Sequence, residues 1–236
     1  MLLAALVAAA TLHLPILEYH RIGPLTPRLD ALTRRLTVAP ADFAAQMDWL
    51  ARNGFHAVGA RQAYDALELG GRLPPRPVLL TFDDGYRDVL WNAAPVLHRL
   101  RMPAVAFVIS GRVDGPDPSF LTWPELRRLE RDGFAVESHT VSHADLPALP
   151  PARALAELRD SRAALQAHLG RPVDWLSYPF GREDASVRAL ARRAGYRAAV
   201  TELPGDVQRG ADPLELHRDE ILDTTGVAGL AALLGR

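Results

Sequence analysis

Short apolar runs alternate with longer amphipathic segments along almost the whole chain. The short runs are rich in Val, Ile, Leu and Phe, so they predict buried β-strands. These strands are expected at residues 16–20, 55–58, 77–83, 104–110, 134–139, 175–180, 197–202 and 219–222. Apolar residues at helical spacing predict helices at residues 41–53, 61–69, 88–100, 122–132, 151–169, 186–194 and 227–234.

Helix-ending signals support this division. Gly54, Gly170 and Gly195 each follow the last residue of a helical pattern, as C-cap glycines do. Thr122 and Glu125 have the spacing of a capping box at a helix start. Regular alternation of strand and helix predicts parallel strands joined by crossover helices, which makes this an α/β protein.

Composition narrows the class of protein. The chain has 236 residues, of which 48% are hydrophobic and 23% charged, which fits one globular domain without an interdomain linker. A formal net charge of -1 gives no reason to expect a nucleic-acid partner or electrostatic binding to an anionic membrane. The absence of cysteine excludes disulfides, thiolate nucleophiles and zinc–cysteine sites.

The N-terminal stretch has two interpretations. Residues 1–12 are apolar and rich in Ala, like the core and end of a secretory signal, although they lack a start that bears Lys or Arg. They are too few to span a bilayer. We favour a signal-like segment at residues 1–14 and a domain at residues 15–236, and hence an extracytoplasmic protein of the cell envelope or medium. The alternative is a cytoplasmic protein whose first residues belong to the domain.

Two adjacent carboxylates follow the apolar run at residues 77–80. Asp83 and Asp84 precede Gly85, whose backbone freedom permits a sharp turn that aims both acids into one pocket. Like charges side by side repel where the dielectric constant is low, so a bound cation is the simplest compensation. The alternative is an Asp-Gly turn with solvated carboxylates.

Two histidines follow another strand-like run. His139 and His143 are four residues apart, so they can share one face of a helical turn and converge on one ion. An aspartate and two histidines suit zinc or a similar divalent ion. Three protein ligands leave one coordination position for water and substrate, which is typical of a catalytic site.

Other reactive side chains also stand at the ends of predicted strands. His20 ends the first strand, and Tyr178-Pro179-Phe180-Gly181 ends another. In parallel α/β folds, functional residues gather at the carboxyl ends of the strands. We therefore expect these residues and the two acid and histidine pairs to face one site.

Three segments match the motifs of a known family. Residues 81–85 (TFDDG), 137–143 (ESHTVSH) and 176–181 (LSYPFG) resemble three motifs of the polysaccharide deacetylases of carbohydrate esterase family 4, the last in the Tyr-Pro-aromatic-Gly form of one subgroup. The resemblance extends from about Pro15 to Leu234. It implies a single-domain, distorted (β/α) barrel of about seven strands. It also implies metal-dependent hydrolysis of N-acetyl groups on an amino-sugar polymer or oligosaccharide.

The resemblance also implies roles for individual residues. Asp84, His139 and His143 would bind a divalent metal, zinc or alternatively cobalt or nickel. Asp83 would be the general base, and the backbone N–H of Phe180 would help to hold the oxyanion.

The remaining motifs depart from the family pattern. Many members carry an Arg two residues before the third-motif Pro, where it orients the base, and here that position is Ser177. The late Leu-x-His motif is absent, because His217 follows Leu216 directly. The general acid is therefore left open. His20 and Tyr178 are interpreted as substrate-binding residues.

Three functions remain compatible with these residues. The leading hypothesis is a carbohydrate N-deacetylase that acts on an acetylated amino-sugar polymer. A non-catalytic carbohydrate-binding protein on the same scaffold would explain the missing Arg, although such a protein has no need of a base beside a metal. A metallohydrolase of another amide or ester is the third. The sequence names neither the polymer, the metal nor the oligomeric state.

Overall fold

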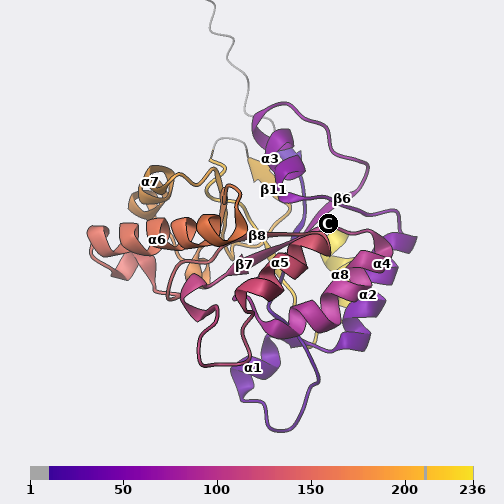
Figure 1. The fold of residues 1–236 in the computed structure, drawn as a ribbon. Coiled ribbons are helices and arrows are strands. Elements are labelled where there is room, and N and C mark those ends of the chain that lie inside the picture. The colour runs from indigo at the N-terminus through magenta and orange to yellow at the C-terminus, as the bar shows by residue number, and fades with distance from the viewer. Residues whose placement is uncertain (1–10, 210–211, 236) are drawn as a thin grey trace, which may run out of the picture.

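A curled parallel sheet forms the centre of the computed structural model, which describes residues 11–209 and 212–235 (Figure 1). The strands follow the order β10-β9-β8-β7-β6-β2-β12, and neighbouring strands are parallel throughout. Their bounds are Ile16–Tyr19 (β2), Pro77–Phe82 (β6), Ala104–Val108 (β7), Phe134–Ser138 (β8), Trp175–Ser177 (β9), Ala198–Val200 (β10) and Asp219–Glu220 (β12). This arrangement confirms the predicted single α/β domain with a distorted barrel of about seven strands.

Helices cover the outer face of the sheet, except Ala60–Glu68 (α3), which lies at one end of the barrel (Figure 1). The helices that cover it are Pro40–Arg52 (α2), Ala94–Leu100 (α4), Trp123–Arg131 (α5), Pro151–Leu169 (α6), Ala185–Ala194 (α7) and Val227–Leu234 (α8). In Figure 1, α6 and α7 lie on one side of the sheet and α2, α4 and α8 on the other. The predicted helices are confirmed, except that the one expected at 88–100 begins as a π-helical segment, Val89–Ala93. No helix among the described residues is long and apolar enough to cross a bilayer.

Two regions contain structure that the sequence pattern did not predict. The stretch between the strand predicted at 16–20 and the helix predicted at 41–53 holds a short helix, Ala31–Arg35 (α1), and β4 (Thr37–Val38), which pairs with β3 (Arg21–Ile22). Near the N-terminus, β1 (Thr11–His13) pairs antiparallel with β11 (Val207–Arg209). Most of the predicted signal-like segment, residues 1–10, lies outside the described residues.

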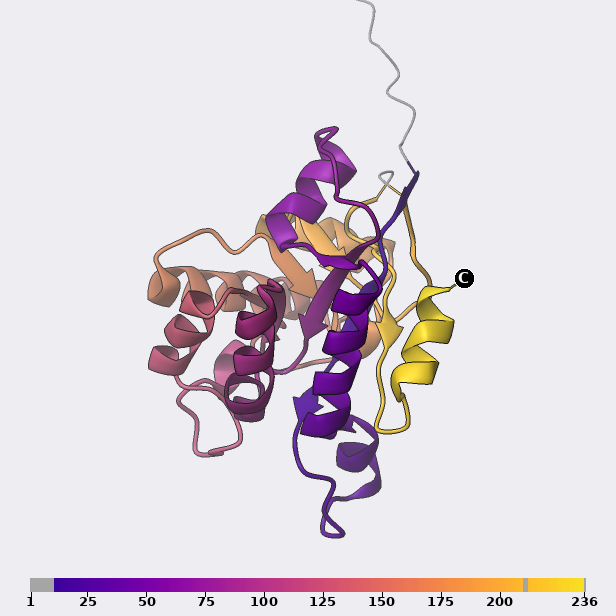
Figure 2. The same ribbon diagram turned by 90° about the vertical axis from the view of Figure 1, so that its right-hand side faces the viewer.

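The two faces of the sheet bury different side chains. Side chains alternate between the faces of a strand, so Leu80 and Phe82 of β6 join the outer core beneath the helices. Leu79 joins an inner core with Val105 and Trp175 from neighbouring strands. Residues of α3 belong to this inner core as well. In both ribbon views α3 and α1 lie at opposite ends of the barrel (Figure 1, Figure 2).

One late segment closes the ring of strands. Leu216 bridges to Val200 of β10 in parallel fashion. Three residues later β12 begins, and it pairs with β2 at the other edge of the sheet. Residues 216–220 therefore link the two edges, and Arg218 lies between these two pairings.

Candidate functional site

The inward-facing positions change from apolar to polar toward the carboxyl ends of the strands. Along β6 the inward series runs from Leu79 through Thr81 to Asp83, and along β2 it runs from Ile16 to Glu18 and on to His20. All four polar residues of these two series are buried. The carboxyl end of the barrel is thus a polar chamber above an apolar floor, as expected from residues at strand ends.

Asp83 is held by a buried arginine. The Arg218 guanidinium donates from Nη1 to Asp83 Oδ1 at 2.9 Å and from Nη2 to Oδ2 at 2.8 Å. The Ser177 hydroxyl donates to the same Oδ2 at 2.8 Å, and Arg218 in turn donates to that hydroxyl at 3.0 Å. A bidentate pair of this kind fixes the plane of the carboxylate as well as its charge.

The charge of Arg218 decides the ionisation of Asp83. Burial alone would raise the pKa of Asp83, but Arg218, with smaller contributions from His139 and His20, holds that pKa well below its ordinary value. Arg218 also forms an ion pair with Glu18 at 3.1 Å. Burial raises the pKa of Glu18 well above its ordinary value, and neither of its carboxylate oxygens accepts a hydrogen bond from a described residue. Asp83 is therefore the main counterion of Arg218.

Arg218 is the main site residue that the sequence reasoning missed. The arginine expected at position 177 is absent, and the small Ser177 side chain at that position bonds to Arg218. The alternation of side chains along an extended segment could have identified Arg218. Leu216 faces the inner core, so Arg218, two residues on, faces the same interior. The segment reads Leu-x-Arg, with arginine where the family motif places histidine.

Asp84, His139 and His143 converge, as predicted, although not through a helix. Oδ1 of Asp84 lies 3.5 Å from His139 Nε2 and 3.7 Å from His143 Nε2. The ligand atoms of the three residues all lie within 4.8 Å of one another. The prediction of a helical turn at 139–143 is wrong, because no helix forms there and Thr140 and His143 have φ angles of 65° and 62°. This left-handed backbone turns the second histidine back toward the first.

Hydrogen bonds hold the histidine loop in its unusual shape. Glu157 on α6 accepts from the backbone N–H groups of Val141 and Ser142 at 2.9 and 2.8 Å. The His143 N–H donates to the Thr140 hydroxyl at 3.1 Å. His139 Nδ1 lies 2.8 Å from the Ser177 carbonyl oxygen, so Nδ1 carries the proton and the Nε2 lone pair faces Asp84.

The electrostatics of these three residues fit a cation. Burial and the neighbouring Asp83 raise the pKa of Asp84 to about 7. Burial lowers the pKa of His139 to about 3 and also lowers that of His143. Two neutral imidazoles and an uncompensated carboxylate are the protonation states that a divalent metal requires of its ligands. The donor set therefore fits the metal that the sequence predicts, without distinguishing zinc from cobalt or nickel.

A second group of potential ligands does not form a cation site of the same kind. Glu18, His20 and Asp83 also bring ligand atoms within 4.8 Å of one another, and all three are buried. The guanidinium of Arg218 already contacts both carboxylates. An additional cation there would meet the charge of Arg218, so we regard Arg218 as the cation of this group.

The segment 178–181 forms a strained turn beside the histidines. Phe180 has a φ of 59°, which is costly for a residue with a β-carbon, and its ring lies edge-on to His143 with centroids 4.5 Å apart. The N–H of Phe180 has no hydrogen-bond partner among the described residues. Tyr178 is fully buried and does not line the cavity, so its role in substrate binding stays a prediction.

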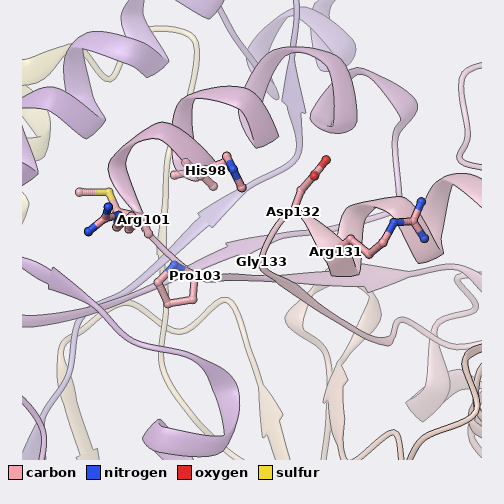
Figure 3. Close-up of a pocket in the computed structure, with 8 residues that line it drawn as sticks. His98, Arg101, Pro103, Arg131, Asp132 and Gly133 are labelled. Atoms are coloured by element: carbon pink, nitrogen blue, oxygen red, sulfur yellow. The ribbon is translucent and has the colours of Figure 1, made fainter.

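The site opens to solvent through a cavity of about 430 Å³. Asp83, Asp84, His139, His143, His20 and Phe180 all line it, together with Leu32, Arg112, Glu202 and others. A groove of about 400 Å³ between the C-terminal ends of α4 and α5 offers a contrast. Figure 3 shows its two labelled basic side chains, Arg101 and Arg131, at opposite ends without converging on a common point. Reactive side chains thus converge in the first cavity and not in this groove.

A barrel that gathers an Asp-His-His cluster beside an ion-paired aspartate defines a class of hydrolytic domain, and comparison with known proteins identifies the family. Residues 70–199 match the model of the polysaccharide deacetylase family, and the chain belongs to that family. A putative polysaccharide deacetylase of Bacillus subtilis, YxkH, is 31% identical over 218 residues, which cover 92% of this chain and 74% of that protein.

Two further relatives extend the comparison. The Streptococcus pyogenes deacetylase PplD, solved in complex with acetate, has a TM-score of 0.88 and 27% identity, and the match covers 96% of this chain and 99% of that one. The poly-β-1,6-N-acetyl-D-glucosamine N-deacetylase of Escherichia coli is 31% identical over 121 residues, covering 45% of this chain and 18% of that protein.

Proposed function

We propose that this protein removes N-acetyl groups from an acetylated amino-sugar polymer or oligosaccharide by metal-dependent hydrolysis. The observation that carries the proposal is that two adjacent carboxylates, Asp83 and Asp84, have different partners and pKa shifts of opposite direction. Asp83 is ion-paired to Arg218 and has a lowered pKa, whereas Asp84 faces two neutral histidines. Deacetylation needs both a base and a metal cation. Asp83 suits the role of the base, and Asp84 suits that of a metal ligand.

Asp84, His139 and His143 are the proposed metal ligands. A divalent cation bound there would activate the attacking water and polarise the acetyl carbonyl. We expect His143→Ala to lower the metal content of the purified protein far below that of the wild type. His98→Ala is the matched control, because His98 is an exposed histidine on α4 that lines the groove in Figure 3. Full metal content in His143→Ala would remove this assignment.

Asp83 acts on the attacking water, and Phe180 acts on the carbonyl oxygen of the substrate. Asp83 accepts the proton of the water as its oxygen bonds to the carbonyl carbon. Arg218 and Ser177 keep the carboxylate oriented while it does so. The free N–H of Phe180 donates to the carbonyl oxygen as that oxygen becomes negative.

His20 is the proposed acid for the leaving amine. Its side chain lines the cavity, its Nε2 lies 3.7 Å from Glu18 Oε1, and its buried Nδ1 has no hydrogen-bond partner among the described residues. Burial lowers the pKa of His20, so its imidazole is neutral at rest and first takes up the proton that Asp83 accepts from the water; the imidazolium formed in this way is a strong acid toward an amine. As the C–N bond breaks, that proton passes to nitrogen and acetate leaves.

Poly-β-1,6-N-acetylglucosamine is the first substrate to test, because the Escherichia coli relative is named for it. Acetate release would be measured from β-1,6- and β-1,4-linked N-acetylglucosamine oligomers and from acetylated peptidoglycan, with zinc or cobalt present. We expect release from at least one of them, and its loss on chelation. A folded, metal-loaded protein that releases acetate from none would overturn the proposed activity.

The substrate class also places the proposed activity outside the cytoplasm, at the cell envelope or in the medium. Such polymers are mostly extracytoplasmic. Fractionation of cells that express the full-length gene tests this location. Recovery only from the cytosol, with Met1 retained, would contradict it.

A further inference from the structure

The carboxylates that line the cavity have different partners. Asp83 is paired with Arg218, and Asp84 faces the two histidines. Glu220 accepts from Arg35 at 2.9 Å. Glu202 is the exception, because it makes no hydrogen bond or ion pair with any described residue. An unpaired anion therefore stands at the mouth of the proposed active site.

The backbone places Glu202 against the turn that carries Phe180. A β-carbon added to Gly181 would meet the Glu202 backbone nitrogen at an impossible separation and its Cβ at 2.6 Å, so the two residues are packed as closely as glycine permits. Gly181 has a φ of 60°, which glycine adopts without strain. The ring of Phe180, next to Gly181, is 52% exposed. Glu202 and Phe180 thus line the same cavity from two segments that contact each other at Gly181.

We infer that Glu202 and the Phe180 ring bind an ammonium group of the substrate, on a free glucosamine unit next to the N-acetylated unit being hydrolysed. A carboxylate attracts the ammonium charge, and the face of an aromatic ring adds a cation–π contribution. The inference rests on the proposed deacetylase function, whose product is such an amine. Burial raises the pKa of Glu202 and the charges of Arg218 and Arg35 offset this only in part, so a cation that enters beside it relieves the remaining cost.

Another part of the mouth carries a charge of the other sign. Arg112 follows β7 and lines the same cavity, and it has no ion pair with a described carboxylate. Its guanidinium lies over the Phe120 ring at 5.6 Å. An ammonium group is therefore favoured on the Glu202 side and disfavoured on the Arg112 side.

The test compares two β-1,6-linked N-acetylglucosamine tetramers, one fully acetylated and one with a single free amine. For the wild type, we expect kcat/KM to be about three- to tenfold higher for the tetramer with the free amine, which corresponds to one exposed ion pair with a cation–π contact. Glu202→Gln should bring this ratio to about one, with little change for the fully acetylated tetramer. Glu220→Gln is the matched control, since it removes a charge of the same mouth that is already paired, and it should keep the ratio. A wild-type ratio of one or less, or an unchanged ratio in Glu202→Gln, would overturn the inference.

A binding measurement separates this inference from the proposed activity. Calorimetry at low salt would compare the affinity of the fully deacetylated glucosamine tetramer for the wild type and for Glu202→Gln. We expect at least threefold weaker binding to Glu202→Gln, and a smaller difference at high salt because ions screen exposed charges. If neither acetylated tetramer is hydrolysed but this difference is found, the proposed activity fails and the ammonium site stands. Equal affinities would refute the ammonium site whatever the activity.

Discussion

Asp83 and Asp84 are neighbours in sequence, yet they belong to two contrasting halves of the site. The half around Asp83 is closed, because Arg218 and Ser177 bond to both carboxylate oxygens and the residue is fully enclosed by the barrel. The half around Asp84 opens to the cavity, where that carboxylate has imidazole neighbours at 3.5 and 3.7 Å and a hydrogen bond from the Tyr86 side chain but no arginine partner. One aspartate has a cation from its own chain, and the other has a place for a cation from solution.

The contrast arises from one peptide unit. Asp83 continues the inward alternation of β6, whereas Asp84 adopts a φ of 71° and leaves that alternation. The pKa values move in opposite directions as a result, lowered at Asp83 and raised to about 7 at Asp84. A like-charged pair is therefore accommodated by assigning each member its own counterion.

The largest expected effect comes from removing the charge of Asp83 alone. Asp83→Asn retains the shape but cannot accept a proton, so acetate release should fall by about two to four orders of magnitude. Metal content, measured by mass spectrometry on the folded protein, should stay at the wild-type level. Loss of metal in this variant would make Asp83 a ligand and abolish the division between the two halves.

Removing Arg218, the partner of Asp83 in the closed half, should lower both the stability of the protein and its rate of acetate release. Arg218→Ala leaves Asp83 and Glu18 buried without their cation, and we expect the free energy of unfolding to fall by about 3–5 kcal/mol in urea titrations. Arg218→Lys keeps the charge but loses the bidentate geometry, so acetate release should drop by about a hundredfold. Arg99→Lys, on a surface pair with Asp48, is the control and should change stability by no more than about 0.5 kcal/mol. An Arg218→Lys protein with wild-type rate would show that only the charge matters.

The open half should bind metal in a pH-dependent way. Asp84 must lose its proton to bind a cation, and its pKa is raised to about 7. Zinc affinity should therefore weaken about tenfold for each pH unit below about 7, as measured by competition with a chelator. The pKa of His139 is lowered to about 3, so its proton does not compete in this range. A flat profile would contradict the raised pKa of Asp84, and a steeper one would show that histidine protons compete too.

The smallest expected effect concerns the Phe180 ring. Phe180→Gly keeps the N–H and suits the left-handed backbone, so acetate release from a fully acetylated oligomer should fall less than about tenfold, against 10²–10³ for loss of an oxyanion donor. Phe180→Ala is the matched variant, because it also removes the ring but keeps the β-carbon. The free energy of unfolding in urea titrations should be about 1 kcal/mol higher for Phe180→Gly than for Phe180→Ala. A hundredfold loss of rate in both would assign catalysis to the ring rather than the amide.

The strands and their reactive ends could be predicted because both depend on local pattern. Asp83, Asp84, His139 and Phe180 each follow a short apolar run, and a parallel sheet brings such ends to one edge. The capping box at Thr122 was predictable for the same reason, and the Thr122 N–H does donate to Glu125 at 3.0 Å.

The partners of these residues could not be predicted so directly. Arg218 meets Asp83 across 135 positions of sequence, and only closure of the ring of strands brings them together. The histidine pair has helical spacing, but Glu157 and the left-handed Thr140 fix a loop instead. In both cases tertiary hydrogen bonds outweigh the local preference that the sequence displays.

The order in which the chain leaves the ribosome gives the position of Arg218 a further meaning. The proposed metal ligands have all been made once His143 is added, and Glu157 and Ser177, which hold the histidine loop and His139, follow later. Arg218 is added near the end, on the segment that joins β10 to β2. A partly made or partly closed molecule therefore lacks the group that orients Asp83, so hydrolytic competence appears only when the barrel is complete.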